Sequence, residues 1–384
     1  MWRNIASNAL TLFIALLLLL GGVVIWGKTQ YSGPGPLEKP ICLRIEGGSN
    51  MRRVSQELLD KGAISSRAIF RIGADYSGRA ADLKAGSFLL PEGASMQQIV
   101  EEITRSGRST CGTEVNFRVG ILSAEVQVRE LDPATNRYEE VMAFDPSSEE
   151  APAGYSDVAA QPDVRFRVTL AEGVTSWQVV EELKQADFLS GQVPELPDEG
   201  SLAPDSYEIP RDTGRSDLIA QMQERQSRIL AELWQGRAEG LPLDTPEQAL
   251  VLASIVEKET AVPEERPQVA SVFINRLEQG IRLQTDPTVI YGITDGKGAL
   301  GRGLRQSELR ADTPYNTYVI DGLPPTPIAN PGRASIAATL NPADTNYLYF
   351  VADGSGGHAF AETLAEHNEN VAKWRAIEAQ QDGN

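Results

Sequence analysis

Cysteine and histidine are scarce in this sequence. Cys42 and Cys111 are its only cysteines, and it has 2 histidines among 384 residues. Two thiols cannot supply a four-thiolate zinc site, and two imidazoles add few ligands, so we expect neither a metal nor a cofactor.

Basic residues are outnumbered. The sequence has 35 Lys and Arg against 53 Asp and Glu, a formal net charge of -18. Phosphate backbones bind surfaces rich in Lys and Arg, so this charge argues against nucleic acid as a partner. The length is sufficient for about two or three domains with a sizeable core.

A long uncharged segment lies near the N-terminus, between Arg3 and Lys28. As a helix it reaches about 36 Å, enough to cross a bilayer core of about 30 Å. Trp26 and Lys28 follow the apolar run where a signal peptide would have a small-residue cleavage site. We therefore predict a cytoplasmic tail at 1–8, an uncleaved transmembrane anchor at 9–27, and a linker at 28–40 that lets the soluble part stand off the membrane.

The orientation follows from charge. Arg3 and the amino terminus precede the apolar segment, and an acidic body follows it, which favours a cytoplasmic N-terminus and a body outside the cytoplasm. In an oxidising compartment Cys42 and Cys111 can form a disulfide.

Three segments repeat one pattern: an extended run, a turn with Glu and Gly, a small polar residue and an amphipathic helix. The turns lie at 46–48, 92–93 and 172–173. Each pattern predicts a strand, a turn and a capped helix. The first two repeats fall within 41–113, which resembles a LysM-like module of the kind that lies on glycan chains. Cys42 and Cys111 bracket this region and would come within bridging range if its first and last strands pair, which leaves the bond itself undecided.

Alternating apolar residues follow the module. The run Val115, Phe117 and Val119 is typical of a β-strand, and we interpret 114–170 as a β-rich insertion of hairpins. The stretch 145–163 is rich in Pro, Ser, Gly and acidic residues, which favours a mobile loop. A connecting strand-helix region at 171–240 and a mainly helical domain at 241–378 complete a predicted α+β fold.

One helix of the last domain carries a candidate acid. Thr245-Pro246-Glu247 is typical of a helix start, and the helix is predicted to run to about Ala261. At 100° per residue Glu257 lies among small and apolar side chains, where desolvation would raise the pKa of its carboxyl and suit it to general acid catalysis. Glu259 lies on the opposite face, and spacing alone does not choose between the two.

The motifs around this helix carry a family resemblance. They are LASIVEKET at 252–260, VASVFINRL at 269–277, LQTDPTVIYG at 283–292, YNTY at 315–318, GLPP at 322–325, IANPG at 328–332, YLYFVAD at 347–353 and GGHAF at 356–360. In this order they closely resemble the YceG-like family of endolytic murein transglycosylases (MltG). The strong similarity covers roughly residues 247–374, and looser similarity reaches back to residue 40.

The resemblance implies a reaction and a catalytic residue. The family's catalytic acid is the first Glu of the Glu-Lys-Glu-Thr run, which is Glu257 here, with Glu259 as a structural neighbour. The implied reaction cleaves the β-1,4 bond between N-acetylmuramic acid and N-acetylglucosamine in a nascent peptidoglycan strand and leaves a 1,6-anhydromuramoyl end. Glu257 would protonate the leaving oxygen, and as a carboxylate it would then take the proton of the attacking C6 hydroxyl.

Six further residues are predicted to bind the glycan, because they place amide, aromatic or imidazole groups in loops and turns of the matching motifs. They are Gln284, Tyr315, Asn316, Tyr318, Asn330 and His358. Structural roles stay open for Tyr318 as a core aromatic residue and for His358 as a hydrogen-bonded turn residue. Asp286 has the alternative role of an Asx turn ahead of Pro287.

The implied partners are peptidoglycan glycan strands, the inner membrane through one helix, and peptidoglycan synthases. The catalytic body would be periplasmic, with the LysM-like module presenting glycan to the catalytic domain at 241–378. Two alternatives stay open. One is a noncatalytic peptidoglycan-binding scaffold, and the other is a water-using muramidase with Glu259 or Asp286 as a second carboxylate.

Overall fold

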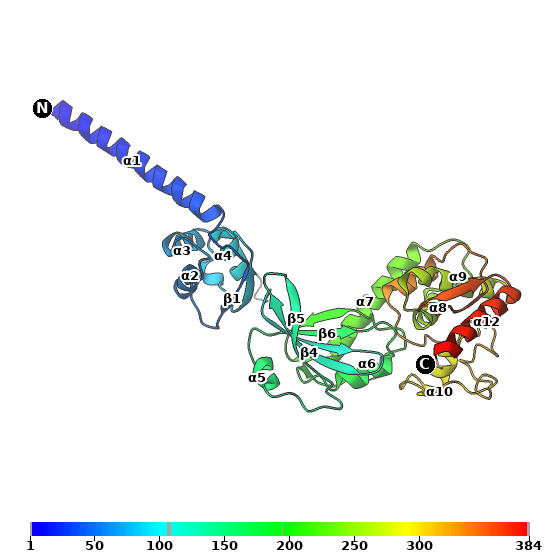
Figure 1. Ribbon diagram of the computed structural model, residues 1–384. Coiled ribbons are helices and arrows are strands. Elements are labelled where there is room, and N and C mark those ends of the chain that lie inside the picture. Colours follow the sequence, from blue (N-terminus) through cyan, green and yellow to red (C-terminus); the bar gives the residue numbers. More distant parts are fainter. Residues whose placement is uncertain (1, 106–108, 194, 382–384) are drawn as a thin grey trace. The chain divides into compact units, whose positions relative to one another are not determined.

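The computed structural model describes residues 2–105, 109–193 and 195–381, and it confirms the α+β class. Figure 1 shows the elements in their order along the chain. The chain divides into two compact units, which are described separately. Unit 1 comprises residues 1–115, 127–143 and 151–165, and unit 2 comprises residues 116–126, 144–150 and 166–384.

Unit 1 begins with helix α1, Trp2–Ser32. Its apolar part, Leu10–Ser32, is long and hydrophobic enough to cross a membrane, and the protein does not bury it. This helix is therefore compatible with a single-pass membrane anchor. It also continues through residues 28–32, which the sequence assigns to the linker.

The remainder of the predicted linker is packed against unit 1. The ring of Tyr31 lies so close to Gly73 that a Cβ at position 73 would overlap it. Gly35 N–H donates to the carbonyl of Gly93 at 3.0 Å, Gly93 N–H donates to that of Leu37 at 2.8 Å, and Leu37 is buried. The predicted stand-off role of 28–40 therefore differs from the structure, because its glycines allow close packing as well as flexibility.

The rest of unit 1 includes a small α/β module. Strand β1, Ile41–Ile45, pairs antiparallel with β2, Gly86–Leu90. Helices α2 (Met51–Asp60) and α3 (Arg67–Tyr76) and the short η1 (Ala80–Asp82) lie between these strands in sequence, and α4 (Met96–Thr104) follows. Their apolar faces form one core that includes Leu43, Leu58, Phe70, Phe88 and Ile99. The LysM-like assignment of 41–113 stays a prediction.

The three repeated turns have the expected local structure. Gly48, Gly93 and Gly173 have φ of 80°, 66° and 80°, a region that glycine enters without steric cost. The helix that follows each turn has a polar N-cap whose side chain accepts a backbone N–H three residues on; these N-caps are Asn50, Ser95 and Thr175. The strand, turn and capped-helix pattern is thus confirmed.

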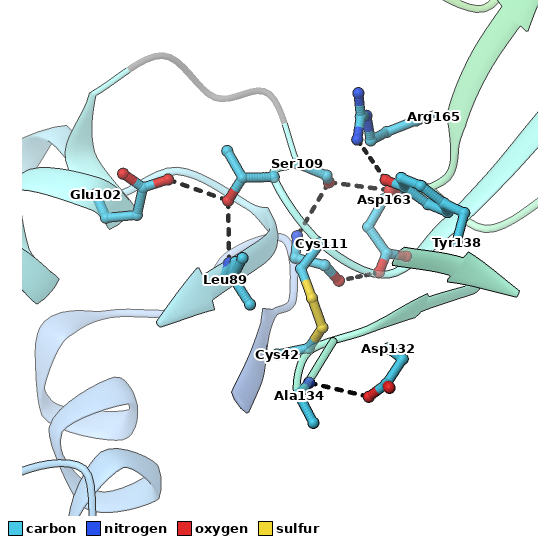
Figure 2. The surroundings of a disulfide bond; sticks show 12 residues. Cys42, Leu89, Glu102, Ser109, Cys111, Asp132, Ala134, Tyr138, Asp163 and Arg165 are labelled. Carbon is cyan, nitrogen blue, oxygen red and sulfur yellow. Dashed lines mark hydrogen bonds between the residues drawn. A yellow bond between two sulfur atoms is a disulfide. The ribbon is translucent and has the colours of Figure 1, made fainter. Parts of the chain in front are cut away.

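A disulfide joins Cys42 of β1 to Cys111, with Cα atoms 5.8 Å apart (Figure 2). The segment that carries Cys111 lies along β2, because Thr110 N–H and Cys111 N–H donate to the Ser87 carbonyl at 2.8 and 3.1 Å. The bond that the sequence left undecided is therefore formed, and it links the first strand of the module to the segment beyond α4.

Asp163 holds the end of the predicted mobile loop. Its carboxylate accepts a hydrogen bond from Ser87 Oγ at 2.7 Å and pairs with Arg44 at 3.0 Å, and its carbonyl accepts from Ser109 Oγ at 2.9 Å. Figure 2 shows Asp163 beside the disulfide. The loop also contains a short helix, α5, Tyr155–Ala159, which the composition of 145–163 does not indicate.

A five-stranded sheet has the order β5-β4-β3-β6-β8. Residues Val115, Phe117 and Val119 are buried in it, and β6 pairs antiparallel with β8, with Val168 opposite Tyr207. Strands thus occupy much of the predicted β-rich region, and its status as an insertion stays a prediction. The bounds are β3 Thr113–Val119, β4 Ala124–Asp132, β5 Arg137–Phe144, β6 Arg165–Leu170 and β8 Ser206–Ile209.

The C-terminal part of unit 2 is mainly helical. Helix α8 packs against α9 and α11 around a core that includes Leu252, Phe273 and Ile336. Short strands pair in parallel (β7, Leu189–Ser190; β9, Thr213–Gly214) and antiparallel (β10, Tyr349–Ala352; β11, His358–Ala361). The helices are α6 Ser176–Leu183, α7 Arg215–Gln235, α8 Pro246–Glu259, η2 Pro263–Glu265, α9 Arg266–Glu278, α10 Asp286–Thr294, α11 Arg333–Leu340 and α12 Leu364–Gln381.

Candidate active site

Helix α8 positions the candidate acid. Its start is as predicted: the Thr245 side chain accepts the Gln248 N–H, and Pro246 occupies the first turn. The helix ends at Glu259, two residues before the predicted Ala261. Its middle is buried in the core, which fixes the direction of its last turn, where Glu257 lies.

Glu257 is held by one peptide N–H and one cation. Its side chain is 5% exposed. Oε2 accepts a hydrogen bond from the N–H of Gly332 at 2.9 Å, and Oε1 lies 3.7 Å from Nη2 of Arg266. Both contacts stabilise negative charge on this carboxylate.

Glu172 is a second carboxylate beside the same cation. Nη2 of Arg266 lies 3.4 Å from Glu172 Oε2, so one nitrogen is close to both acids. The oxygens of Glu172 and Glu257 are therefore within about 7 Å of each other, which overlaps the separations of about 5 to 9.5 Å between glycosidase carboxyls. Burial, and then the charge of Glu257, raise the pKa of the Glu172 carboxyl, while Arg266 lowers it.

Backbone pairing brings these acids together. Gly173 N–H donates to the carbonyl of Asn330 at 2.9 Å, and Asn330 N–H donates to that of Val174 at 2.9 Å. Lys258 Nζ donates to the carbonyl of Gly173 at 3.3 Å. The turn that carries Glu172 thus lies beside the segment that carries Gly332. A Cβ at Gly332 would overlap the Glu172 carboxyl, so the close approach requires glycine there.

Asn330 organises this site from within the protein. It is fully buried. Its Oδ1 accepts the N–H of Leu202 at 2.9 Å, and its Nδ2 donates to the Val174 carbonyl at 3.0 Å. The structure therefore makes Asn330 a positioning residue, in place of the predicted sugar contact, because its amide is used by the backbone.

Glu199 is a half-buried acid whose carboxylate lies at the start of α6. Oε1 accepts the Ser176 N–H at 2.8 Å, and Oε2 accepts the Tyr291 hydroxyl at 3.2 Å. Burial raises the pKa of this carboxyl, and these hydrogen bonds oppose the rise. The predicted residue Tyr315 lies beside this group, with its ring 5.0 Å from that of Tyr291 and its hydroxyl 2.8 Å from that of Thr326.

The opposite side of α8 carries Glu259. Thr285 Oγ1 donates a hydrogen bond to Glu259 Oε1, and burial raises the pKa of the Glu259 carboxyl. Thr285 is itself held by Thr317, whose hydroxyl accepts its N–H at 3.0 Å. Glu259 is thus a half-buried acid whose carboxyl is bound to Thr285.

Two predicted site residues lie near Thr285 and Asp286, on the Glu259 side of the helix. Gln284 is exposed and has φ of 50°, and its N–H donates to the Thr317 carbonyl at 3.1 Å. The Tyr318 hydroxyl donates to Oδ1 of Asp286 at 2.7 Å. Burial, followed by this hydrogen bond, raises the pKa of Tyr318. The structure therefore groups these two residues with Glu259, and their binding of glycan stays a prediction.

Asn316 is turned into the protein. It is fully buried, its Nδ2 donates to the carbonyls of Glu308 at 3.1 Å and Ala311 at 2.7 Å, and its Oδ1 accepts the Tyr318 N–H at 3.1 Å. The predicted sugar contact is therefore not available at Asn316, whose amide holds the loop closed.

His358 is bound to the residue before Arg266. Its Nδ1 lies 2.7 Å from Oε2 of Glu265, and its N–H donates to Oε1 of the same carboxylate at 2.8 Å. The ring packs edge-on against Phe350, with centroids 5.3 Å apart. His358 thus fixes the start of α9 and with it Arg266, which favours the open alternative of a hydrogen-bonded structural residue.

The site that results consists of two carboxylates, a cation and a peptide N–H. Such a set can give a proton to a substrate oxygen and receive another on the same acid. Glu172, Arg266 and Gly332 were not predicted as site residues, although the Glu-Gly repeat pattern singled out the turn at 172–173. The set also extends outside 241–378, because Glu172 precedes that range.

Comparisons with known proteins find relatives of one kind. Endolytic murein transglycosylases of Bacillus subtilis and Streptococcus pneumoniae are 28% identical over 363 residues and 27% identical over 360 residues. These alignments cover 93% and 88% of this chain, and 91% of the Bacillus protein but 58% of the Streptococcus protein. A crystal structure of a yceG-like protein from Listeria monocytogenes is 26% identical, with a TM-score of 0.45, and the match covers 86% of this chain and 99% of that one.

The family profile matches more than half of the chain. It is that of the YceG-like family, and it extends over residues 146–373, which include Glu172, Glu257, Arg266 and Gly332. The chain belongs to the YceG-like family.

Proposed function

We propose that this protein is a lytic transglycosylase that cuts peptidoglycan strands internally. Family membership and relatives named endolytic murein transglycosylases support this activity. The observation that carries the proposal is Glu257, a nearly buried carboxylate between the Gly332 N–H and Arg266. The bond cleaved is the β-1,4 linkage from N-acetylmuramic acid to N-acetylglucosamine.

Glu257 serves in both steps of this reaction. It first gives its proton to the glycosidic oxygen as the bond to the anomeric carbon breaks. The resulting carboxylate then takes the proton of the muramic C6 hydroxyl, whose oxygen bonds to the anomeric carbon. The product has a 1,6-anhydro ring, Glu257 is protonated again, and no water is consumed.

The groups around Glu257 suit this exchange. The Gly332 N–H and Arg266 stabilise the carboxylate formed in the first step. Arg266 is shared with Glu172, so a change of charge on one acid alters the field at the other.

We place the enzyme at the inner membrane. The length and hydropathy of α1 support its role as the anchor. In this proposal the N-terminus lies in the cytoplasm and the catalytic body in the periplasm. A tethered enzyme meets nascent strands where they leave the polymerase, so cleavage there would end or trim strand growth. The LysM-like module would present glycan, and peptidoglycan synthases are proposed partners. Copurification of the full chain from membranes tests that partnership, and no enrichment of any synthase would count against it.

Substitution Glu257→Gln tests the catalytic role. The amide cannot give or take the proton, so we expect anhydro products to fall at least about 10²-fold while glycan binding is retained. Purified peptidoglycan is digested and the fragments are weighed by mass spectrometry. Glu247→Gln, an exposed acid at the other end of α8, is the matched control and should keep full activity. Anhydro products at the wild-type rate from Glu257→Gln would refute the mechanism, and intact binding without products from the wild type would favour the noncatalytic scaffold.

A water-using muramidase is the second candidate. The contact of Arg266 with both Glu172 and Glu257 favours it specifically, because a water-using glycosidase needs a second carboxylate. Glu172 is better placed for this role than the predicted Glu259 or Asp286, which are bound to Thr285 and Tyr318. Hydrolysis adds about 18 mass units relative to an anhydro end, so the fragment masses choose between the reactions. Hydrolytic products that disappear in Glu172→Gln would establish the muramidase.

A further inference from the structure

The outer face of α3 exposes an apolar stripe. Ala68, Ile72 and Tyr76 recur every four residues and therefore lie on one side of the helix. All three are exposed, Ile72 by 67% and Tyr76 by 95%. The helix buries Phe70 and Ala74 on its other side, so its packing in the module leaves the stripe free.

This stripe lies beside the end of the candidate membrane helix. Helix α1 packs against α3, and the Tyr31 ring fills the space over Gly73, the residue next to Ile72. Figure 1 shows α3 next to the C-terminal end of α1. Because both helices belong to unit 1 and their contact is close, the position of α1 in a bilayer would determine the height of α3.

The height of α3 above the hydrocarbon core of the bilayer is small. Trp26 is an aromatic residue of the kind found at membrane interfaces. Tyr31 lies five positions further along the helix, a rise of about 7.5 Å. The headgroup region on each side of a bilayer is about 5 to 8 Å thick. With Trp26 at the edge of the hydrocarbon, Tyr31 and the adjoining part of α3 lie at headgroup level.

The charge around the stripe suits anionic lipid. Arg67, Arg71 and Arg79 lie on or just after α3, against Asp75 alone among acids of that segment. This local excess of positive charge occurs in a chain of net charge -18. Basic side chains near a membrane surface strengthen binding to anionic lipid.

We propose that the outer face of α3, formed by Ala68, Ile72 and Tyr76, rests in the headgroup layer of an anionic membrane as a second contact beside α1. The apolar side chains enter the interface, and Arg71, the neighbour of Ile72, meets lipid phosphates, while Arg67 and Arg79 are bound to Gln56 and Thr104 and add only to the local positive charge. This contact rests on the proposed anchoring of α1 and holds unit 1 in one orientation on the bilayer. It is independent of the reaction at Glu257.

The test uses the full chain in vesicles of phosphatidylethanolamine and phosphatidylglycerol. A third cysteine, introduced as Ile72→Cys or Tyr76→Cys and purified without reductant, is labelled with an environment-sensitive fluorophore. Arg52→Cys, at an exposed position of α2 in the same module, is the matched control. Emission and quenching by lipids with a nitroxide at the headgroup are measured, and flotation of the vesicles reports anchoring separately.

We expect blue-shifted emission and headgroup quenching at 72 and 76, with water-like, unquenched emission at 52. Floating protein with water-like emission at all three positions would overturn the membrane contact and leave the anchor and the enzyme proposals standing. A blue shift without nitroxide quenching would assign the stripe to a protein partner and would also overturn it. Protein that does not float would overturn the anchor and the contact together, while glycan cleavage is assayed independently.

Discussion

Gly332 combines two requirements at one residue. Its N–H binds Glu257, and its missing side chain leaves room for the Glu172 carboxyl. We expect Gly332→Ala to displace the Glu172 carboxyl, which the added Cβ would overlap, and to lower the rate of glycan cleavage by up to about 10²-fold, because a misplacement of about 1 Å in a catalytic site can cost that much. Rates on purified peptidoglycan check this.

The control is Gly303→Ala, since an added Cβ there meets no atom within 4 Å. It should leave the rate unchanged. A Gly332→Ala enzyme with the wild-type rate would show that the approach of Glu172 to Gly332 does not matter for catalysis.

Glu199 makes stability depend on pH. Its pKa is raised from 4.5 by burial, so the folded protein binds this proton more tightly than the unfolded chain does. Its stabilising effect is full below the unfolded pKa and is lost as pH rises through the folded pKa. We therefore expect the free energy of unfolding of the wild type, relative to Glu199→Gln, to fall as pH increases from about 4 to about 8. Urea unfolding at both ends of this range measures the difference, and a constant difference would contradict the raised pKa.

Residue-scale prediction from sequence succeeded where contacts are local. Thr245 and the N-caps after the Glu-Gly turns bind backbone three residues away, so a short motif contains all their partners. Arg266 and Glu172 are 94 residues apart, and Gly332 and Glu257 are 75 apart, so no local pattern joins them. Residue type was also a misleading guide at Asn316 and Asn330, because a side-chain amide that can bind sugar hydroxyls can equally form hydrogen bonds with backbone groups.

At the scale of elements, Gly73 of α3 leaves room for a side chain of α1, as Gly332 does for Glu172. In a helix interior alanine is normally favoured over glycine by about 1 kcal/mol. A Cβ at position 73 would overlap the Tyr31 ring, so we expect Gly73→Ala to destabilise the packing of α1 on α3 instead. Thermal unfolding of the full chain in detergent should show a lower midpoint.

A double-mutant cycle isolates this contact. Tyr31→Ala removes the ring, so Gly73→Ala in that background should be neutral or stabilising. Gly27→Ala serves as the control in α1, where an added Cβ meets no atom within 4 Å. Equal effects of Gly73→Ala in both backgrounds would mean that the Tyr31 contact contributes nothing.

Element prediction differed most where composition was the guide. Residues 28–40 contain the glycines and prolines of a linker, but Leu37 is buried and residues 28–32 are helical. In 145–163 polar composition suggested mobility, whereas α5 and the contacts of Asp163 give the segment structure. Periodic patterns did better, because α8 and the strands around Phe117 bury the side chains that their spacing predicts.

At the scale of the whole molecule, the disulfide belongs to unit 1 alone. Cys42 and Cys111 are 69 residues apart, and a closed loop of that length stabilises by about 4 kcal/mol in the chain-entropy description. We expect Cys42→Ser with Cys111→Ser to accelerate amide hydrogen exchange throughout 41–105 and to leave 246–361 unchanged. Exchange measured by mass spectrometry reports both regions in one experiment. Equal acceleration in both would show that the units unfold as one.

Because α1 is continuous up to Tyr31, the number of residues in this helix determines how unit 1 is rotated about the helix axis. Each residue added between Gly27 and Tyr31 would turn everything beyond it by about 100° and raise it by about 1.5 Å. For an α1 that lies along the bilayer normal, one added residue would therefore swing unit 1 around that normal at almost unchanged height, with the α3 face still toward the bilayer. Seven would return it to within about 20° of its azimuth but lift it by about 10 Å, so rotation and elevation are set together by the number of residues in this one helix.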